Sequence, residues 1–372
     1  MVLKYKEYAR LKRGLDGGVS AVAFSPDATY IAVAGTFDNT VYLWRVAERK
    51  LVETYKGSSP YLSMRWLPGR TDELLCGSRG GCVDHLKLTH VSFSPTPIDV
   101  YEQSQGALTV KGFRAHERPV ECLAVSSSLL ATGAQCEVTV WKDLHGGAYR
   151  RLIDLPPPPR SSHNEDSEVL ATGIHWTKSR KYSSLLLVSY MFHGIVIYDA
   201  STWNSVRYIP TPGLVAGSSV TPDGSLFAVS NVMTGFDVYD MDTTTCVGGC
   251  PNEAGALRAV PVLFVHEGHA LFGGSTAGRV HLWNVNSRRI HQTFHLGAED
   301  QVLAIDAHYN RVRDRFLLAA GVSNGGNSRV VIWIARKCRT VPSSSEYKAP
   351  AQVKVIMDAG HLVEGCPTMR VV

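Results

Sequence analysis

The stretch FSPDATYIAVAGTFDNTVYLW, residues 24–44, decides the fold. FSPD is typical of a strand end that runs into a turn, and IAVAG is an apolar strand. FDN is a second turn, and TVYLW is a strand whose side chains alternate between two faces. This one stretch therefore predicts most of a small antiparallel sheet, and every later block of the chain resembles a degraded copy of it.

Seven short strings share the pattern of the last strand in this stretch. They are TVYLW (40–44), CVDHL (82–86), EVTVW (137–141), GIVIY (194–198), GFDVY (235–239), RVHLW (279–283) and RVVIW (329–333). Their ends lie 41 to 57 residues apart. Because a four-stranded propeller blade takes roughly 40–45 residues, the spacing predicts seven blades, with inserted loops in the longer intervals.

The FSPD turn, the turn at Asp38 and the VYLW strand together resemble the WD-repeat family of β-propellers. The resemblance covers about residues 4–335 and implies an all-β, seven-bladed β-propeller of four-stranded antiparallel blades. The repeats have drifted, because the last pair of the strand is never Trp-Asp: it is Trp44-Arg45 in the first copy and Tyr198-Asp199 in the fourth. The drift and the style of the loops are also similar to those of fungal propellers.

We expect one propeller domain over residues 1–335, with insertions near 89–106 and 155–168, and a flexible tail over 336–372. KYKEYARLKR, residues 4–13, is predicted to supply the outermost strand of the seventh blade, which would remove exposed strand edges and join the chain ends. Residues 338–342 are the competing closing strand. The proline run of the second insertion favours a mobile surface loop that acts as a spacer, with a ligand for a proline-binding module as the alternative.

One blade carries a histidine signal of the family. His116 stands before the third blade where WD repeats commonly have the His of a Gly-His pair. The resemblance implies that His116 hydrogen-bonds toward the strand residue Trp141. Gln135 or Cys136 replaces the acid of the turn, so the complete polar network is not expected in this blade.

The other blades retain different members of the same set. Blade one has Asp38 and Trp44 but places Leu15 where the His would be. Trp283 and Trp333 fill the strand aromatic position of blades six and seven. Stability is therefore expected to come from apolar packing more than from polar networks. The same reasoning predicts that two tryptophans in the position of Phe24, Trp66 and Trp176, are packing residues.

Composition limits the functional classes. The 372 residues carry a formal net charge of +5, and their basic clusters form no stripe with interleaved aromatics, so direct nucleic-acid binding is not expected. The eight cysteines lack paired C-x-x-C spacing, and the N-terminus has no signal-peptide core, which favours the cytoplasm or the nucleus. The longest apolar stretch, residues 185–198, is too short for a transmembrane segment.

Catalytic and cofactor motifs are not found. His266-Glu267-Gly268-His269 has the wrong spacing for a zinc protease and falls in a turn. No phosphate-binding loop or nucleophile elbow occurs, so no cofactor, metal or enzymatic activity is expected. An enzyme that uses the central channel is the alternative, with Asp306 and His175 near the innermost strands and no obvious partner for either.

The expected function is a non-enzymatic scaffold or adaptor that binds proteins or peptides on the turn-lined upper face. The family resemblance implies that residues seven before the strand aromatic contact partners; these are Phe37, Arg79, Ala134, Met191, Val232, Thr276 and Gly326. Apolar anchors beside an arginine suit a peptide-binding patch, although Met191 and Val232 fit packing against neighbouring loops equally well. Residues 149–152, Tyr-Arg-Arg-Leu, are similar to the Phe-Arg-Arg-Gly signature of phosphoinositide-binding propellers, which gives a membrane-surface alternative.

Overall fold

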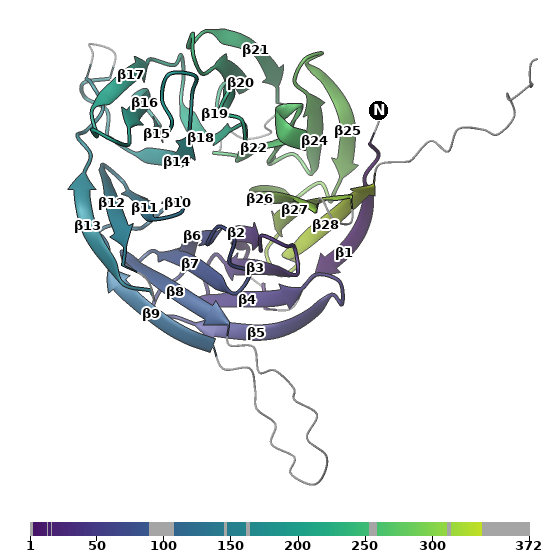
Figure 1. Cartoon of the computed structure of the whole chain (residues 1–372). Helices are drawn as coiled ribbons and strands as arrows, with labels where there is room; N and C mark the ends of the chain where they lie inside the picture. Colours follow the sequence, from purple (N-terminus) through teal and green to yellow (C-terminus); the bar gives the residue numbers. More distant parts are fainter. Residues whose placement is uncertain are drawn as a thin grey trace, which may run out of the picture. The chain divides into compact units, whose positions relative to one another are not determined.

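The chain forms a ring of seven four-stranded antiparallel sheets around a central channel (Figure 1). The computed structural model describes residues 3–12, 14–15, 17–88, 108–144, 147–160, 164–252, 259–310 and 314–336. The first insertion, 89–106, and the predicted tail beyond residue 336 lie outside the described residues. The prediction of an all-β, seven-bladed propeller is confirmed.

Each blade has four strands ordered from the channel outward. The innermost strands are β2 (Val19–Phe24), β6 (Tyr61–Trp66), β10 (Cys122–Val125), β14 (Ala171–Thr177), β18 (Val215–Val220), β22 (Val262–Val265) and β26 (Gln301–Asn310). The second strands are β3 (Tyr30–Gly35), β7 (Glu73–Ser78), β11 (Leu129–Ala134), β15 (Leu185–Tyr190), β19 (Leu226–Asn231), β23 (Ala270–Gly273) and β27 (Arg315–Ser323). A short 3-10 helix, η1 (His266–Gly268), joins β22 to β23.

The third strands contain the seven repeated strings. They are β4 (Thr40–Arg45), β8 (Cys82–Leu88), β12 (Glu137–Asp143), β16 (Gly194–Asp199), β20 (Gly235–Asp240), β24 (Arg279–Asn284) and β28 (Arg329–Arg336). The outermost strands are β5 (Lys50–Lys56), β9 (Leu108–Arg114), β13 (Tyr149–Asp154), β17 (Ser205–Ile209), β21 (Cys246–Pro251), β25 (Arg289–His295) and, in blade seven, β1 (Lys6–Leu11).

The N-terminal segment closes the ring. β1 pairs antiparallel with β28, from Lys6 opposite Ile334 to Leu11 opposite Val330. The predicted closure by the N-terminal strand is therefore confirmed, and the competing strand 338–342 lies outside the described residues. β1 is the fourth, outermost strand of blade seven, so β28 has no exposed edge.

The residues before β1 also bind blade six. The backbone N–H of Tyr5 donates to the Gln292 side chain (2.9 Å), whose amide donates back to the Tyr5 carbonyl (2.9 Å). The Tyr5 hydroxyl lies 2.6 Å from His266 Nε2, and the two rings stack. A side-chain nitrogen of His291 lies 2.7 Å from the Leu3 carbonyl. The N-terminus therefore ties blade six to blade seven.

The core consists of apolar layers between adjacent blades. Trp66, at the end of β6, is 8% exposed, and its indole N–H donates to the Ala23 carbonyl of blade one (3.0 Å). Trp176 bonds in the same way to the Ala124 carbonyl of the preceding blade (3.1 Å) and is half-buried. Both tryptophans therefore join neighbouring innermost strands, and Trp176 also reaches the channel.

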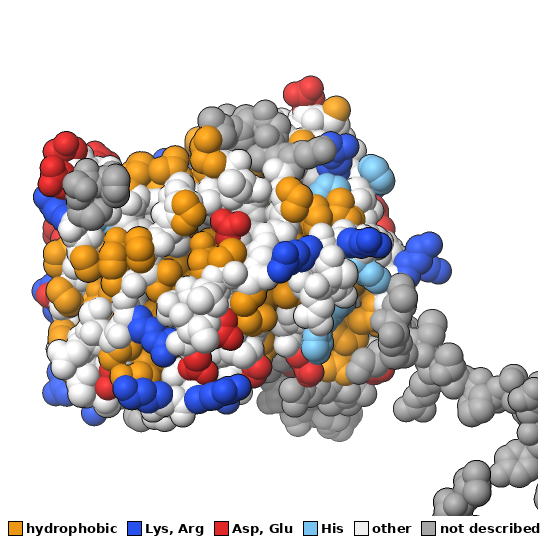
Figure 2. Space-filling view, turned by 90° about the horizontal axis from the view of Figure 1, so that it is seen from above, with side chains coloured by type: hydrophobic (Ala, Val, Ile, Leu, Met, Phe, Trp, Pro, Cys, Tyr) orange, Lys and Arg blue, Asp and Glu red, His pale blue; other side chains and the backbone are white. Residues whose placement is uncertain are grey.

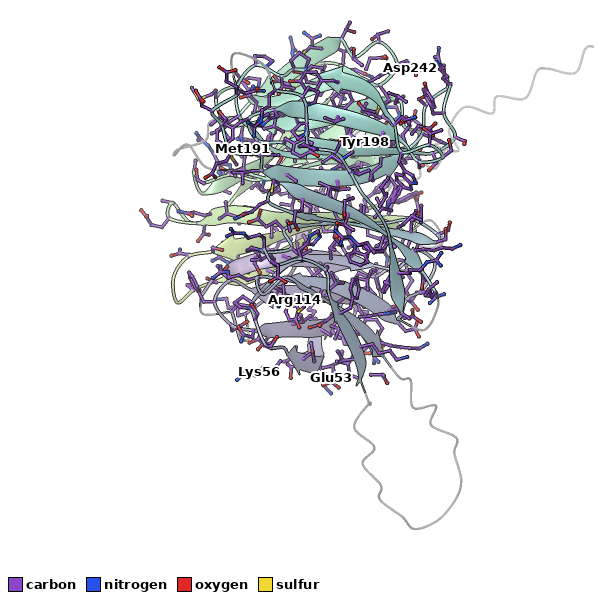
Figure 3. The ribbon with its side chains drawn as sticks, turned by 90° about the vertical axis from the view of Figure 1, so that its left-hand side faces the viewer. Glu53, Lys56, Arg114, Met191, Tyr198 and Asp242 are labelled. Atoms are coloured by element: carbon purple, nitrogen blue, oxygen red, sulfur yellow. The ribbon has the colours of Figure 1, made fainter. Side chains whose placement is uncertain are left out.

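The ring has two distinct faces (Figure 3). We call the side that carries the turns between second and third strands the upper face; Met191 marks it in Figure 3. The lower face carries the turns after the first and third strands, such as the one that holds Asp242. Val19 lies opposite Gly35, at the upper end of β3, so each innermost strand runs from the upper to the lower face.

The described parts of the second insertion contact blade four. Leu155 is buried in the apolar layer between blades three and four. The Tyr198 hydroxyl donates to the Pro156 carbonyl (3.0 Å), and the Asn164 amide lies 3.4 Å from the Phe192 carbonyl. Both ends of this insertion are therefore held by protein contacts, whereas residues 161–163 lie outside the described part of the chain.

Candidate functional site

Phe37 is the most exposed large apolar side chain of the upper face. It stands on the turn between β3 and β4, over Gly17, and is 73% exposed. A Cβ atom on Gly17 would lie 2.8 Å from the Phe37 ring, so the small residue leaves room for the aromatic side chain. An aromatic ring left this open contributes little to folding and is available to a partner.

Arg79 holds the matching turn of blade two. Its side chain is exposed, and among the described residues its guanidinium makes no ion pair or hydrogen bond. Blades one and two are neighbours, because β2 packs beside β6. An open aromatic ring and a free cation therefore occupy equivalent turns of adjacent blades.

The remaining predicted partner-binding residues differ in exposure. Ala134 is fully buried and so is not one of the exposed members of this set: it pairs with Glu137 inside the sheet, because the blade-three turn is confined to residues 135–136. Met191 and Val232 are half-buried, and their backbones bond to Leu170 and Leu214 in neighbouring loops. Packing thus accounts for much of the surface of these two side chains.

Other turn residues complete the description of the upper face. Thr276 is half-buried and Gly326 is exposed. Met233, next to Val232, is 64% exposed and was not singled out from the sequence. The predicted position, Val232, is one residue before it, and the blade-five turn exposes the second of these two adjacent apolar side chains.

A polar network joins His116 to Trp141 in blade three. His116 Nε2 lies 2.7 Å from the Thr132 hydroxyl, which also accepts the Trp141 indole N–H (2.9 Å). His116 Nδ1 lies 2.8 Å from a carboxylate oxygen of Glu137. Since a carboxylate only accepts, Nδ1 donates there; the single Thr132 hydroxyl proton is shared between Nε2 and the Thr139 carbonyl (3.4 Å) as possible acceptors. The acid that sequence reasoning missed is Glu137, directly after the expected turn positions Gln135 and Cys136.

Blade one is built differently. Asp38 accepts hydrogen bonds from the Thr40 backbone (3.1 Å) and the Tyr42 hydroxyl (2.9 Å). Leu15 is buried where a histidine was sought, and the Trp44 indole N–H has no partner among the described residues. Asp38 therefore orders the turn under Phe37 without reaching Trp44.

The strand aromatics of blades six and seven pack in the core. Trp283 is buried, and its indole N–H is also without a partner in the described part of the chain. Trp333 packs against Phe294, with ring centroids 4.7 Å apart. Both positions depend on apolar contact.

The channel contains ionisable groups from several innermost strands. Arg65, Glu121, His175 and Asp306 line a cavity of about 320 Å³. Burial raises the pKa of Asp306, whose carboxylate accepts the Phe24 N–H (2.6 Å), and lowers the pKa of His175 to about 4. His175 Nε2 lies 3.1 Å from the Ser218 hydroxyl. No hydrogen bond links Asp306 to His175, so the two residues named for the enzyme alternative form no acid–base pair.

Neither a metal-ligand cluster nor a membrane-spanning helix occurs among the described residues. The residues that the structure describes contain no cluster of three or more His, Cys, Asp or Glu side chains able to hold a metal ion. His266 lies in η1 between strands, as the turn interpretation predicts. In the described part of the chain, no helix has the length and apolar character that a membrane crossing requires.

The Tyr-Arg-Arg-Leu segment lies on the outermost strand β13. Arg150 and Arg151 are both exposed, and Arg151 pairs with Asp154 (Nε to Oδ1, 2.9 Å). One of the two arginines is therefore already neutralised. On the part of the rim that Figure 2 shows, apolar, basic and acidic side chains are intermixed.

Comparisons with known proteins agree with this architecture. Residues 9–45 match the family described as WD domain, G-beta repeat. The chain is also 22% identical, over 174 residues, to mitochondrial division protein 1 of Candida glabrata. That alignment covers 45% of this chain and 24% of the relative, so the chain corresponds to about a quarter of the relative's length. The matched residues run from the end of β1, in blade seven, through the first three strands of blade one, and all seven blades share one architecture; together these findings support assignment to the WD-repeat β-propeller family.

Proposed function

We propose that the protein is a non-enzymatic scaffold that binds a partner protein through the upper face of blades one and two. WD-repeat propellers are generally protein-interaction scaffolds, while the fold by itself fixes no partner. The observation that carries the proposal is the 73% exposure of Phe37, together with the free guanidinium of Arg79 on the equivalent turn of the next blade. Aromatic and arginine side chains are the residues that most often dominate binding energy at interfaces.

The chemistry of this pair describes the partner segment. Phe37 would bury an apolar side chain, and Arg79 would pair with a carboxylate placed next to it. The six described cysteines are free thiols, which suits a partner met in the reducing cytoplasm or nucleus.

Affinity capture followed by measurement of the captured partner's affinity tests the proposal. The Phe37→Ala, Arg79→Glu double variant should bind at least tenfold more weakly, because loss of an interface anchor typically costs 2 kcal/mol or more, about thirtyfold. Its melting temperature should stay close to that of the wild type, since exposed substitutions usually change stability by about 0.5 kcal/mol or less.

The matched control is Leu152→Ala, Arg150→Glu, which changes the same two kinds of side chain on the outer wall of blade three. Leu152 is 42% exposed, and Arg150 is exposed beside it. The control should bind like the wild type. If both double variants keep every captured partner at wild-type affinity, this part of the upper face is not the binding surface.

A further inference from the structure

A second opening lies at the lower mouth of the channel, away from the Phe37 face. It is a pocket of about 500 Å³ between blades two, three, four and five. Its walls come from the ends of innermost strands, including Trp66, the last residue of β6, and Thr177, the last residue of β14. Its size falls within the roughly 300–1,000 Å³ typical of small-molecule sites.

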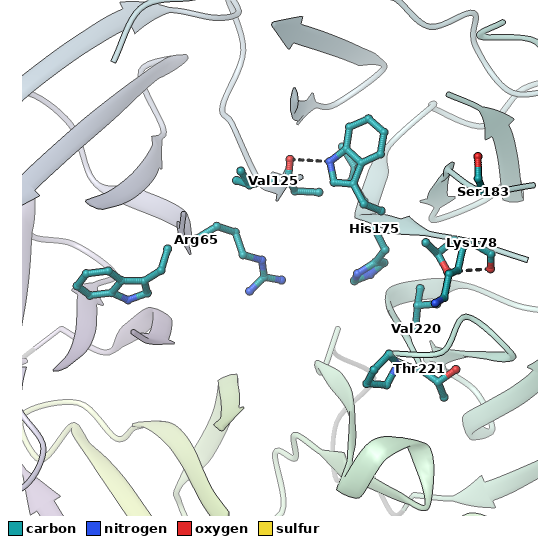
Figure 4. Close-up of a pocket in the computed structure, with 13 residues that line it drawn as sticks. Arg65, Val125, His175, Lys178, Ser183, Val220 and Thr221 are labelled. Carbon is teal, nitrogen blue, oxygen red and sulfur yellow. Dashed lines mark hydrogen bonds between the residues drawn. The ribbon is translucent and has the colours of Figure 1, made fainter. Parts of the chain in front are cut away.

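The charged groups of this pocket are all basic. Arg65 extends into the opening from β6, and Lys178 approaches from the segment after β14 (Figure 4). No Asp or Glu is among the residues that line the pocket. Glu121 and Asp306 border Arg65 only in the adjoining channel cavity, where burial raises the pKa of both carboxyl groups. The pocket wall itself therefore presents two cations to a ligand and no acid.

The Arg65 side chain makes no direct polar contact with the described residues around it. Over the described residues its guanidinium has no ion pair and no hydrogen bond. The Asp306 carboxylate accepts the Phe24 N–H (2.6 Å); burial raises its pKa, the charge of Arg65 partly offsets that rise, and the two groups form no ion pair. A planar guanidinium left free in this way can bind an oxyanion through two parallel hydrogen bonds.

The remaining walls suit the body of an organic molecule. Trp176 is fixed by its bond to Ala124, and Val125, Val220 and Pro222 add apolar surface. His175 faces Arg65 across the opening (Figure 4) and is neutral near pH 7, because burial lowers its pKa to about 4. It therefore adds a hydrogen-bonding group without adding charge.

We propose that this lower-mouth pocket binds a small organic oxyanion, a phosphate ester or a carboxylate, with the anion on Arg65 and Lys178 and the apolar body against Trp176. The ligand enters from the face opposite Phe37. The site is therefore independent of the protein-binding surface proposed above, and either site can be lost while the other remains.

Isothermal titration calorimetry at low ionic strength tests the site with phenyl phosphate, benzoate, inorganic phosphate and phenol. We expect saturable binding of at least one aryl anion, with inorganic phosphate and phenol at least tenfold weaker because each lacks one half of the recognised chemistry. Phenyl phosphate bound more tightly than benzoate assigns a phosphate ester, and the reverse order assigns a carboxylate.

The variant Arg65→Ala, Lys178→Ala should weaken binding of the preferred probe at least tenfold. Lys50→Ala, Arg118→Ala removes one lysine and one arginine from exposed positions outside the pocket and should change affinity less than twofold. If the first double variant does not fold, the single substitution Lys178→Glu, at an exposed position, makes the same test. No saturable aryl-anion binding by the wild type, equal affinity in the pocket and control variants, or phenol bound as tightly as the anions would each overturn the proposal.

Discussion

Closure of the ring by the N-terminal strand predicts a large effect from a small change. Leu11 is the last residue of β1, is 1% exposed, and packs in the layer between blades seven and one. Leu11→Ala should reduce the free energy of unfolding by about 2–5 kcal/mol, the usual range for a buried leucine that leaves a cavity. For a domain of this size the melting temperature should fall by roughly 3–7 °C.

Deletion of residues 1–13 should be more severe than the point substitution. It removes the pairing with β28 together with the contacts of Tyr5 to Gln292 and His266. The exposed edge of β28 should then template association, so the deletion protein should form oligomers as its concentration rises.

Differential scanning calorimetry and size-exclusion chromatography with light scattering measure the two effects. Deletion of residues 338–372 is the control, because β1 already pairs with β28. This control should have the melting temperature of the full chain and should form no more oligomer than the full chain does. A melting temperature unchanged by deletion of residues 1–13, or lowered only by deletion of 338–372, would refute closure by β1.

Two further predictions concern groups inside the propeller. Trp141→Phe should cost about 1 kcal/mol more than Trp44→Phe in chemical denaturation, because the Trp141 indole donates to Thr132 whereas that of Trp44 has no partner; equal costs would contradict this. Burial lowers the pKa of both His266 and His175 from about 6.5 to about 4. As the pH falls, these histidines are therefore protonated in the unfolded chain before they are protonated in the folded one. Their contribution to the free energy of unfolding is fully present above pH 6.5 and is lost as the pH falls toward 4. The loss should reach up to about 2 kcal/mol per histidine at pH 5, and His266→Gln should narrow the difference in melting temperature between pH 7 and pH 5; an unchanged difference would count against the role of His266.

The sequence by itself determined the architecture. Each third strand repeats the same pattern of apolar and aromatic residues, which is typical of a buried or half-buried strand. Seven copies of this pattern therefore predict seven sheets. Residues 4–13 precede the first strand of blade one, and the seventh blade lacks an outer strand of its own. Because an unpaired strand edge is available for pairing, this position predicts that residues 4–13 close the ring. Phe37 and Asp38 could be placed on a turn from local pattern alone.

Only the tertiary structure decided which side chains meet across blades. Glu137 reaches His116 from β12, the third strand of blade three, and Ala134 is buried because its turn is short; neither depends on the periodicity of the sequence. Arg65 and Lys178 are 113 positions apart along the chain, and they line one pocket because ring closure brings the lower ends of the innermost strands together. The strand pattern depends on neighbouring residues and can be predicted from the sequence, whereas charges on different blades come close together only when the ring closes.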